Sequence, residues 1–282
     1  MAIHLLSTIL FIPQTMDKHI KREALIQKLL SYQNVNGLLT LVCVPAGYGK
    51  TTLILEFLEA VDRVCGWISL DEGDNDVIIF LSYFIESMKK AEITIGNEIE
   101  YLALDTSFNS VHIILTEIIN CITASKEKII LVLDDYHLIK SQKVDEIVKF
   151  LIENQPSNLH MIIITRQDPQ FPLSRLRVKG RLAEIRMGEL CFSENESQDF
   201  FHKSMDIEIS NNSIEKVTSH TEGWIAGTQL AGHMFKGLNA EQVENVINKF
   251  NCTHSYIWST VLLRHWILPL CYKLRMASEG RK

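Results

Sequence analysis

Short apolar runs alternate along this chain with longer amphipathic stretches whose apolar positions recur at helical spacing. The runs have the length and β-branched content of buried strands, and they cover residues 38–44, 64–70, 128–133, 159–165 and 182–186. The amphipathic stretches predict helices over residues 17–30, 77–89, 111–125 and 143–153. Strands that alternate with helices are typical of a parallel sheet covered by helices on both faces. We therefore predict an α/β fold.

A glycine-containing turn joins the first predicted strand to an amphipathic helix. The turn and the start of the helix comprise Pro45, Ala46, Gly47, Tyr48, Gly49, Lys50, Thr51 and Thr52. The order strand, glycine loop, Gly-Lys-Thr and helix is that of a phosphate-binding P-loop, so we predict that these eight residues bind a nucleotide. In such a loop Lys50 reaches the β- and γ-phosphates and the hydroxyl of Thr51 holds Mg²⁺. This sequence departs from the full P-loop pattern at Val44, where the pattern has a glycine. The alternative to a phosphate-binding loop is a simple glycine turn that joins the strand to the helix.

The strand over residues 128–133 ends in two carboxylates, Asp134 and Asp135, as a Walker B strand does. Mg²⁺ prefers one or two carboxylates together with water and phosphate oxygens, so we assign Asp134 to the metal with Thr51. Because successive side chains of a strand point to opposite faces, we expect Asp135 to face away from Asp134 and to polarise an attacking water. The alternative is a pair of turn aspartates that cap the next helix.

Arg166 follows the strand over residues 159–165, where a guanidinium can sense the extra charge of a triphosphate. Our catalytic candidates are therefore Lys50, Asp134, Asp135 and Arg166. The alternative for Arg166 is a surface ion pair with Asp168. The sequence shows no catalytic partner for His137 or any other histidine, and for Tyr48 it favours packing within the loop over catalysis.

Composition and charge exclude several other classes. The chain has 282 residues and a net charge of −6, which does not suggest a general nucleic-acid or membrane surface. Its six cysteines are scattered singly, so we expect reduced thiols and a cytoplasmic protein, with no cysteine metal site. The apolar stretch over residues 256–272 contains Arg264 and His265, and a central charge opposes membrane insertion.

After about residue 188 the strand pattern stops and helical spacing continues to residue 238. Ser193 and Glu196 form a capping box at the start of this region. We divide the chain into an N-terminal arm and helix (1–35), a P-loop nucleotide-binding domain (36–187), a small all-helical domain (188–248) and a divergent tail (249–282).

Five motifs occur in order along the chain: VPAGYGKTTL (44–53), WISLDEGDND (67–76), LVLDDYHLI (131–139), ITRQDP (164–169) and TEGWIAGTQLA (221–231). Together they resemble the ATPase module of MalT-type activators of the LuxR family, which are STAND-class P-loop ATPases (signal-transduction ATPases with numerous domains). The resemblance implies a nucleotide switch in which the P-loop and helical domains close over ATP or ADP. It places Ile20 and Arg22 in the adenine pocket, Gly223 and Trp224 near the base and ribose, and Arg166 as the sensor arginine.

The resemblance ends after Ile257, within what looks like the start of a winged helix. We expect a truncated or frame-shifted copy that lacks the winged-helix, sensor and helix-turn-helix domains. The expected ligands are ATP or ADP with Mg²⁺, and self-association or the missing C-terminal domains are further possible partners. We do not expect this chain to bind DNA directly or to contact a membrane.

The leading functional hypothesis is an ATP-binding regulatory module with slow hydrolysis. An AAA+-type motor is the first alternative, although the sequence shows no clear arginine finger or ring interface. A phosphotransferase that uses the same loop is the second, although no acceptor-binding motif is visible.

Overall fold

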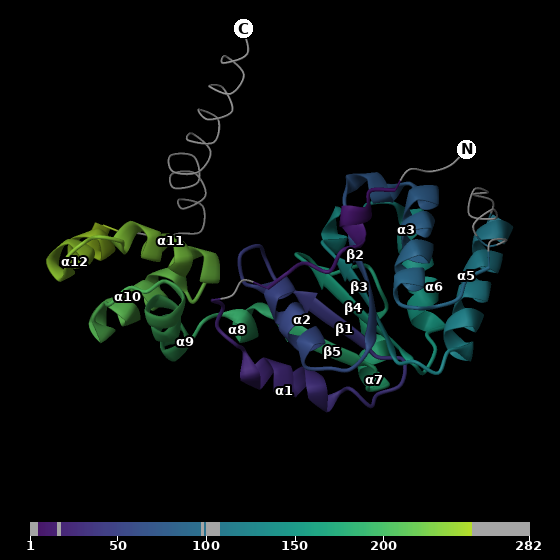
Figure 1. Ribbon diagram of the computed structural model, residues 1–282, viewed down its shortest axis with the longest axis horizontal. Helices are drawn as coiled ribbons and strands as arrows, with labels where there is room; N and C mark the ends of the chain where they lie inside the picture. The colour runs from purple at the N-terminus through teal and green to yellow at the C-terminus, as the bar shows by residue number, and fades with distance from the viewer. Residues whose placement is uncertain (1–4, 16–17, 97–98, 100–107, 250–282) are drawn as a thin grey trace, which may run out of the picture. The chain divides into compact units, whose positions relative to one another are not determined.

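The computed structural model describes residues 5–15, 18–96, 99 and 108–249 (Figure 1). Five parallel strands form one sheet in the order β2-β3-β4-β1-β5. The strands are β1 (Leu39–Cys43), β2 (Val64–Ser69), β3 (Ile129–Asp134), β4 (Leu159–Thr165) and β5 (Leu182–Arg186). The prediction of an α/β fold with a parallel sheet is therefore confirmed, and each predicted strand lies within one residue of its observed bounds.

Helices connect the strands and cover both faces of the sheet. Those of this part are η1 (Ser7–Leu10), α1 (Glu23–Ser31), α2 (Lys50–Glu59), η2 (Glu72–Asn75), α3 (Val77–Lys90), α5 (Phe108–Ala124), η3 (Tyr136–Leu138), α6 (Gln142–Glu153), α7 (Leu173–Val178) and α8 (Met187–Leu190). Figure 1 shows α1 and α2 on one side of the sheet and α3, α5 and α6 on the other.

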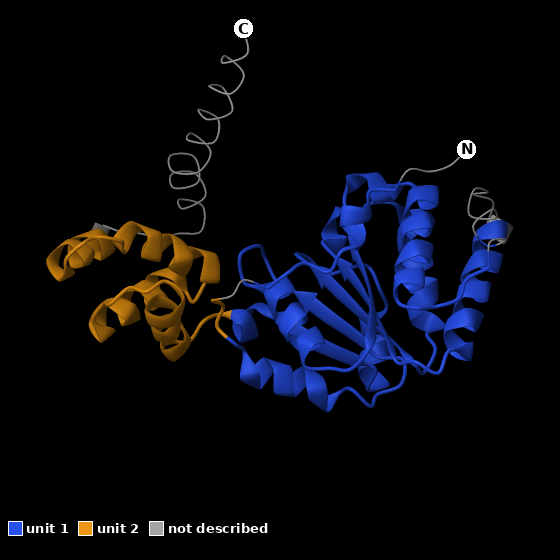
Figure 2. Ribbon diagram, in the orientation of Figure 1, with its two compact units in different colours: residues 1–17, 21–190 blue, residues 18–20, 191–282 orange. Residues whose placement is uncertain are grey.

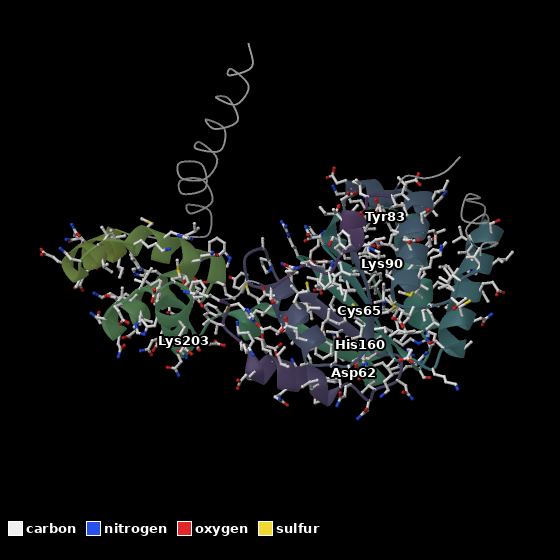
Figure 3. All side chains as sticks on the ribbon, in the orientation of Figure 1. Asp62, Cys65, Tyr83, Lys90, His160 and Lys203 are labelled. Carbon is white, nitrogen blue, oxygen red and sulfur yellow. The ribbon has the colours of Figure 1, made fainter. Side chains whose placement is uncertain are left out.

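Alternate residues of each strand supply the two apolar layers. On β1, Leu39 and Leu41 belong to the large core cluster that includes side chains of α3, α5 and α6. Thr40 points to the opposite face, where it contacts His160 of β4, and the His160 ring lies edge-on to Phe57 of α2. Figure 3 labels His160. Because both faces are covered, the strands are almost continuously apolar, which is why they could be predicted from the sequence.

The register of the sheet brings the carboxyl ends of the strands to one edge. Cys43 at the end of β1 pairs with Thr165 of β4 and with Arg186 of β5, and Ser69 of β2 pairs with Asp134 of β3. In open parallel sheets this edge is where ligands bind. The loops that follow β1, β3 and β4 therefore start from neighbouring points.

The N-terminal arm packs against α3. The backbone N–H of Leu6 donates to the Tyr83 hydroxyl at 3.0 Å, and the ammonium group of Lys90 lies 4.4 Å from the centre of the Phe11 ring (Figure 3). The helix predicted to begin at Asp17 begins at Glu23 instead. Arg22, which precedes it, has non-helical dihedral angles, and its N–H donates to the Glu56 carboxylate at 3.0 Å.

The chain divides into two compact units, residues 1–17 with 21–190 and residues 18–20 with 191–282 (Figure 2). The second unit contains α9 (Glu194–Asp199), η4 (Phe200–Ser204), α10 (Asn211–Thr221), α11 (Ile225–Phe235) and α12 (Ala240–Lys249). Its core is built around residues such as Phe201, Val217 and Phe235. The capping box of Ser193 and Glu196 is confirmed at the start of α9.

The predicted start of a winged helix, residues 250–257, and the tail beyond it lie outside the described residues. In the described part of the chain, none of the helices has the length and apolar character needed to cross a membrane.

Candidate functional site

The turn between β1 and α2 has the backbone of an anion-binding loop. Gly47 and Gly49 have φ angles of 83° and 74°, in the left-handed region that glycine adopts without a steric penalty. Neither of their N–H groups has a hydrogen-bond acceptor among the described residues. Helix α2 begins immediately afterwards at Lys50, so its unsatisfied N–H groups and positive dipole end lie at the same place.

The side chain of Lys50 folds back over this loop. It is only 8% exposed, and its Nζ donates to the carbonyl oxygen of Pro45 at 2.9 Å. Burial, followed by the positive charge of Arg166, lowers the pKa of Lys50, while Asp135 and Asp134 oppose this shift. A buried ammonium group next to unsatisfied N–H groups fits a polyphosphate, which would supply the missing negative charge.

The P-loop and the end of β3 meet through Thr51 and Asp134. The Thr51 hydroxyl donates to Oδ2 of Asp134 at 3.0 Å, across 83 positions of sequence. Asp134 is 6% exposed, and its second oxygen, Oδ1, accepts the N–H of Asp135 at 2.8 Å. Burial and then the charge of Asp135 raise the pKa of Asp134. A hydroxyl and a carboxylate side by side fit Mg²⁺, which takes such oxygen ligands together with phosphate and water.

Asp135 does not lie in the strand, so the expectation that strand alternation sets its direction was wrong. Strand β3 ends at Asp134, and Asp135 has a left-handed backbone with φ of 54° as the N-cap of η3. Its carboxylate is 45% exposed and its Oδ1 lies 3.6 Å from Nδ1 of His137. The turn geometry thus places the Asp135 carboxylate beside an imidazole.

Arg166 is exposed at the first position after β4. The alternative of a surface ion pair with Asp168 is wrong, because Asp168 accepts a hydrogen bond from Arg186 of β5 at 2.5 Å. Arg166 makes no ion pair within the described part of the chain. Its charge instead lowers the pKa of Lys50 and of His137, so its guanidinium acts on the P-loop side of the sheet edge.

The other P-loop residues differ in exposure. Pro45 and Gly47 are exposed, whereas Ala46, Gly49 and Thr52 are half-buried. Tyr48 is buried, as expected for a residue that packs the loop against the domain.

Arg22 is already engaged within the first unit. Its guanidinium donates to the carbonyl oxygens of Leu190 at 3.1 Å and Glu189 at 2.9 Å. These are the last residues of α8, which ends that unit. This arrangement gives Arg22 a structural role, and its assignment to an adenine pocket stays a prediction.

Ile20, Gly223 and Trp224 belong to the second unit. Gly223 has a φ of 70°, and a Cβ atom there would lie 2.5 Å from the carbonyl oxygen of Phe192, so only glycine fits. The N–H of Phe192 donates to the Gly223 carbonyl at 2.8 Å, and Trp224 is buried at the N-cap of α11. Their assignment to the base and ribose also stays a prediction.

Asn75 was not found from the sequence, although it holds the segment after β3. Its side-chain NH₂ donates to the carbonyl oxygens of Glu72 and Leu138, both at 3.0 Å. Its side-chain oxygen accepts the N–H groups of Lys140 at 2.6 Å and Ser141 at 2.8 Å. Asn75 belongs to one of the five sequence motifs, but nothing local to that motif reveals a clamp on residues more than 60 positions away.

A polar cavity of about 630 Å³ lies beside the candidate site. Its lining comes from η3, α6 and the loop after β4, and includes His137, Gln142, Thr165 and Gln167. The cavity borders the candidate site through His137 and Thr165, but Lys50, Asp134 and Arg166 do not line it.

No family model matches the chain. Among solved structures, a Walker-type ATPase of Pyrococcus abyssi is similar at 15% identity and a TM-score of 0.53, over 95% of this chain and 80% of that one. A STAND protein with a tetratricopeptide repeat sensor from Pyrococcus horikoshii matches at 13% identity and a TM-score of 0.55. That match covers 84% of this chain but only 33% of the STAND protein. Drosophila ORC bound to DNA matches at 10% identity and a TM-score of 0.52, over 83% of this chain and 62% of that one.

Together with the sheet order and the loop geometry, these similarities define the class: the chain has the fold of P-loop ATPases. At such low identities they establish the fold alone.

Proposed function

We propose that the chain is an ATP-binding module that hydrolyses its nucleotide slowly and serves as a switch. One observation carries the proposal: the Thr51 hydroxyl and the buried Asp134 carboxylate lie 3.0 Å apart at the foot of the loop that holds Lys50. A cation site and an anion site are thus adjacent, as the Mg²⁺ complex of a nucleoside triphosphate requires.

The chemistry of the residues defines their parts in this function. The N–H groups of the loop and Lys50 bind the phosphates, and Thr51 and Asp134 would hold Mg²⁺, which neutralises phosphate charge when bound. Asp135 is the candidate to orient the attacking water, and Arg166 the candidate to distinguish ATP from ADP. Unassisted P-loop hydrolysis can be as slow as about 10⁻⁴ per second, and a slow rate suits a switch that must keep its nucleotide.

The particular assignment that we propose is the nucleotide-binding module of a MalT-like regulator of the LuxR family. Its support is the set of five sequence motifs and the similarity in fold to a STAND protein. A ligand can shift the arrangement of two units only by as much as its affinity differs between the arrangements. ATP and ADP should therefore differ in affinity if the module is a switch.

Titration calorimetry on the full chain, with ATP and with ADP and each with and without Mg²⁺, tests the proposal. We expect both nucleotides to bind and Mg²⁺ to strengthen ATP binding. The variant Lys126→Ala, in an exposed lysine before β3 at the opposite end of that strand, serves as a matched control for Lys50→Ala and should bind normally. Failure of the unmodified chain to bind either nucleotide at millimolar concentration contradicts the proposal.

An AAA+-type motor is the second candidate, because the fold is also similar to that of Drosophila ORC. A motor turns over steadily and assembles into a ring when ATP binds, whereas a switch stays below about one turnover per second. Light scattering with ATP and a steady-state phosphate assay separate the two. Transfer of the γ-phosphoryl group to a metabolite in a substrate screen would instead indicate a phosphotransferase.

A further inference from the structure

His137 lies next to the site, and its imidazole faces the Asp135 carboxylate. Nδ1 of His137 is 3.6 Å from Oδ1 of Asp135, and the His137 side chain is only 13% exposed. Nδ1 is buried and has no hydrogen-bond partner among the described residues. A buried ring nitrogen without a partner is uncommon, and here a carboxylate lies just beyond hydrogen-bond range.

The backbone of Asp135 indicates that this arrangement is imposed by the fold. Asp135 has a left-handed backbone, a conformation that aspartate adopts more readily than most residues other than glycine. Two hydrogen bonds fix it: the N–H of Asp135 donates to Asp134, and its carbonyl accepts the N–H of Leu138 at 3.0 Å. The Asn75 side chain, which accepts two N–H groups at residues 140–141, ties down the end of the same segment.

The charges around His137 favour its neutral form. Burial and the positive charges of Arg166 and Lys50 lower its pKa, and Asp135 opposes the shift. A neutral imidazole carries one N–H, and a carboxylate next to Nδ1 favours the tautomer with the proton on that nitrogen. His137 can then donate to Asp135 without adding a positive charge.

We propose that His137 is a positioning residue for hydrolysis: it donates its Nδ1–H to Oδ1 of Asp135 and so directs the other carboxylate oxygen at the attacking water. The separation of 3.6 Å closes by a small side-chain rotation, as in many enzymes whose catalytic hydrogen bonds tighten only when substrate is bound. The Asp135 side chain is 45% exposed, so water can reach its carboxylate.

This inference rests on the proposed nucleotide hydrolysis, and the step is balanced as follows. The water oxygen forms a bond to the γ-phosphorus while the bond from that phosphorus to the β–γ bridging oxygen breaks. The bond's electron pair leaves with ADP, and one water proton passes to Asp135. His137 keeps its own proton throughout, because it only orients the carboxylate.

Single-turnover conversion of bound ATP, with the full chain in excess over radiolabelled nucleotide, tests the role of His137. His137→Phe keeps a ring of similar shape without the N–H, and His137→Asn keeps a donor near the position of Nδ1. We expect the Phe variant to slow conversion by about tenfold or more while its Kd for ATP changes less than about twofold, and the Asn variant to recover part of the rate. Gln142→Ala, in the same cavity lining, is the matched control and should convert ATP at the normal rate.

A double-mutant cycle with Asp135→Asn separates positioning from a purely structural effect. If His137 acts through Asp135, His137→Phe should cause no further slowing once Asp135 is Asn. Equal slowing in both backgrounds overturns the inference, as does a normal rate for His137→Phe. If the unmodified chain binds ATP but converts none in a day, the inference about His137 is overturned while the proposed ATP binding stands. If the unmodified chain binds no nucleotide, the proposed function itself is overturned.

Discussion

His160 gives the first unit a stability that should depend on pH in a calculable way. It lies on β4, is 3% exposed, and its Nε2 is 2.8 Å from the Thr40 hydroxyl (Figure 3). Burial, with a smaller effect of Arg63, lowers its pKa from 6.5 to about 3. The imidazole is therefore neutral in the folded chain throughout the physiological range.

The sign of the effect follows from comparing the folded and unfolded states. Below pH 6.5 the unfolded chain binds a proton at His160 that the folded chain rejects until about pH 3, so acidification favours unfolding. Well below pH 6.5, His160 lowers the free energy of unfolding by about 1.4 kcal/mol for each pH unit of acidification. Between pH 7 and pH 5 this loss amounts to about 2 kcal/mol. Asp74 acts in the opposite direction, since burial raises its pKa to about 6 and its proton stabilises the folded chain between pH 6 and its unfolded value of 3.8.

The variant His160→Gln isolates the contribution of the histidine, because it leaves Asp74 in place and keeps a partner for Thr40. Urea unfolding followed by circular dichroism gives the free energy of unfolding at pH 7 and at pH 5. The decrease between the two pH values should be about 2 kcal/mol smaller in the variant than in the unmodified chain. The exposed His233 offers a control, and His233→Gln should leave the loss unchanged. Equal losses in the unmodified chain and His160→Gln would refute the reasoning.

Four further substitutions address the candidate site and its support. Lys50→Ala removes the ammonium group over the loop and should weaken ATP binding by orders of magnitude in calorimetry; an affinity within twofold of normal would contradict its role. Asp134→Asn should leave much of the nucleotide affinity and remove Mg²⁺-dependent hydrolysis, measured as single-turnover phosphate release; normal release would exclude it as a metal ligand. Arg166→Ala should abolish the difference in affinity between ATP and ADP, and an unchanged difference rejects the sensor role. Asn75→Asp loses two donated hydrogen bonds and should lower the free energy of unfolding by about 1–3 kcal/mol in urea, whereas the exposed Asn34→Asp should change it little.

The elements of the sheet could be predicted because their causes are local. A strand buried on both faces needs a continuous apolar run, and the runs ending at Cys43 and Asp134 have that form. The loop of Gly47 and Gly49 is likewise a local pattern, since left-handed backbone at two nearby positions calls for glycine. The prediction started helix α1 too early because the apolar spacing extends to residues before Arg22. The N–H of Arg22 instead donates to the Glu56 carboxylate of α2, and the helix begins at the next residue.

The contacts that shape the site could not be predicted in the same way, because they join distant parts of the chain. We expected the alternation of side chains along a strand to set the direction of the Asp135 side chain. A left-handed turn after the strand sets it instead. The clamp of Asn75 depends on how the β2–α3 loop meets the start of α6. His137 had no visible partner in sequence, since its relation to Asp135 depends on the fold of η3 and not on spacing.

The shifts at Lys50 and Asp134 together describe a site prepared for a charged ligand. Burial disfavours the charge of each group, lowering the pKa of the ammonium and raising that of the carboxylate. Lys50 donates one hydrogen bond, to the Pro45 carbonyl, and Asp134 accepts two, from the Thr51 hydroxyl and the N–H of Asp135. These hydrogen bonds compensate only part of the lost hydration. A phosphate beside Lys50 and a cation beside Asp134 would favour the charged form of both groups. Because burial opposes the charge of both groups, the Mg²⁺ complex of the nucleotide, which supplies both opposite charges, should bind more tightly than either the free nucleotide or the free ion.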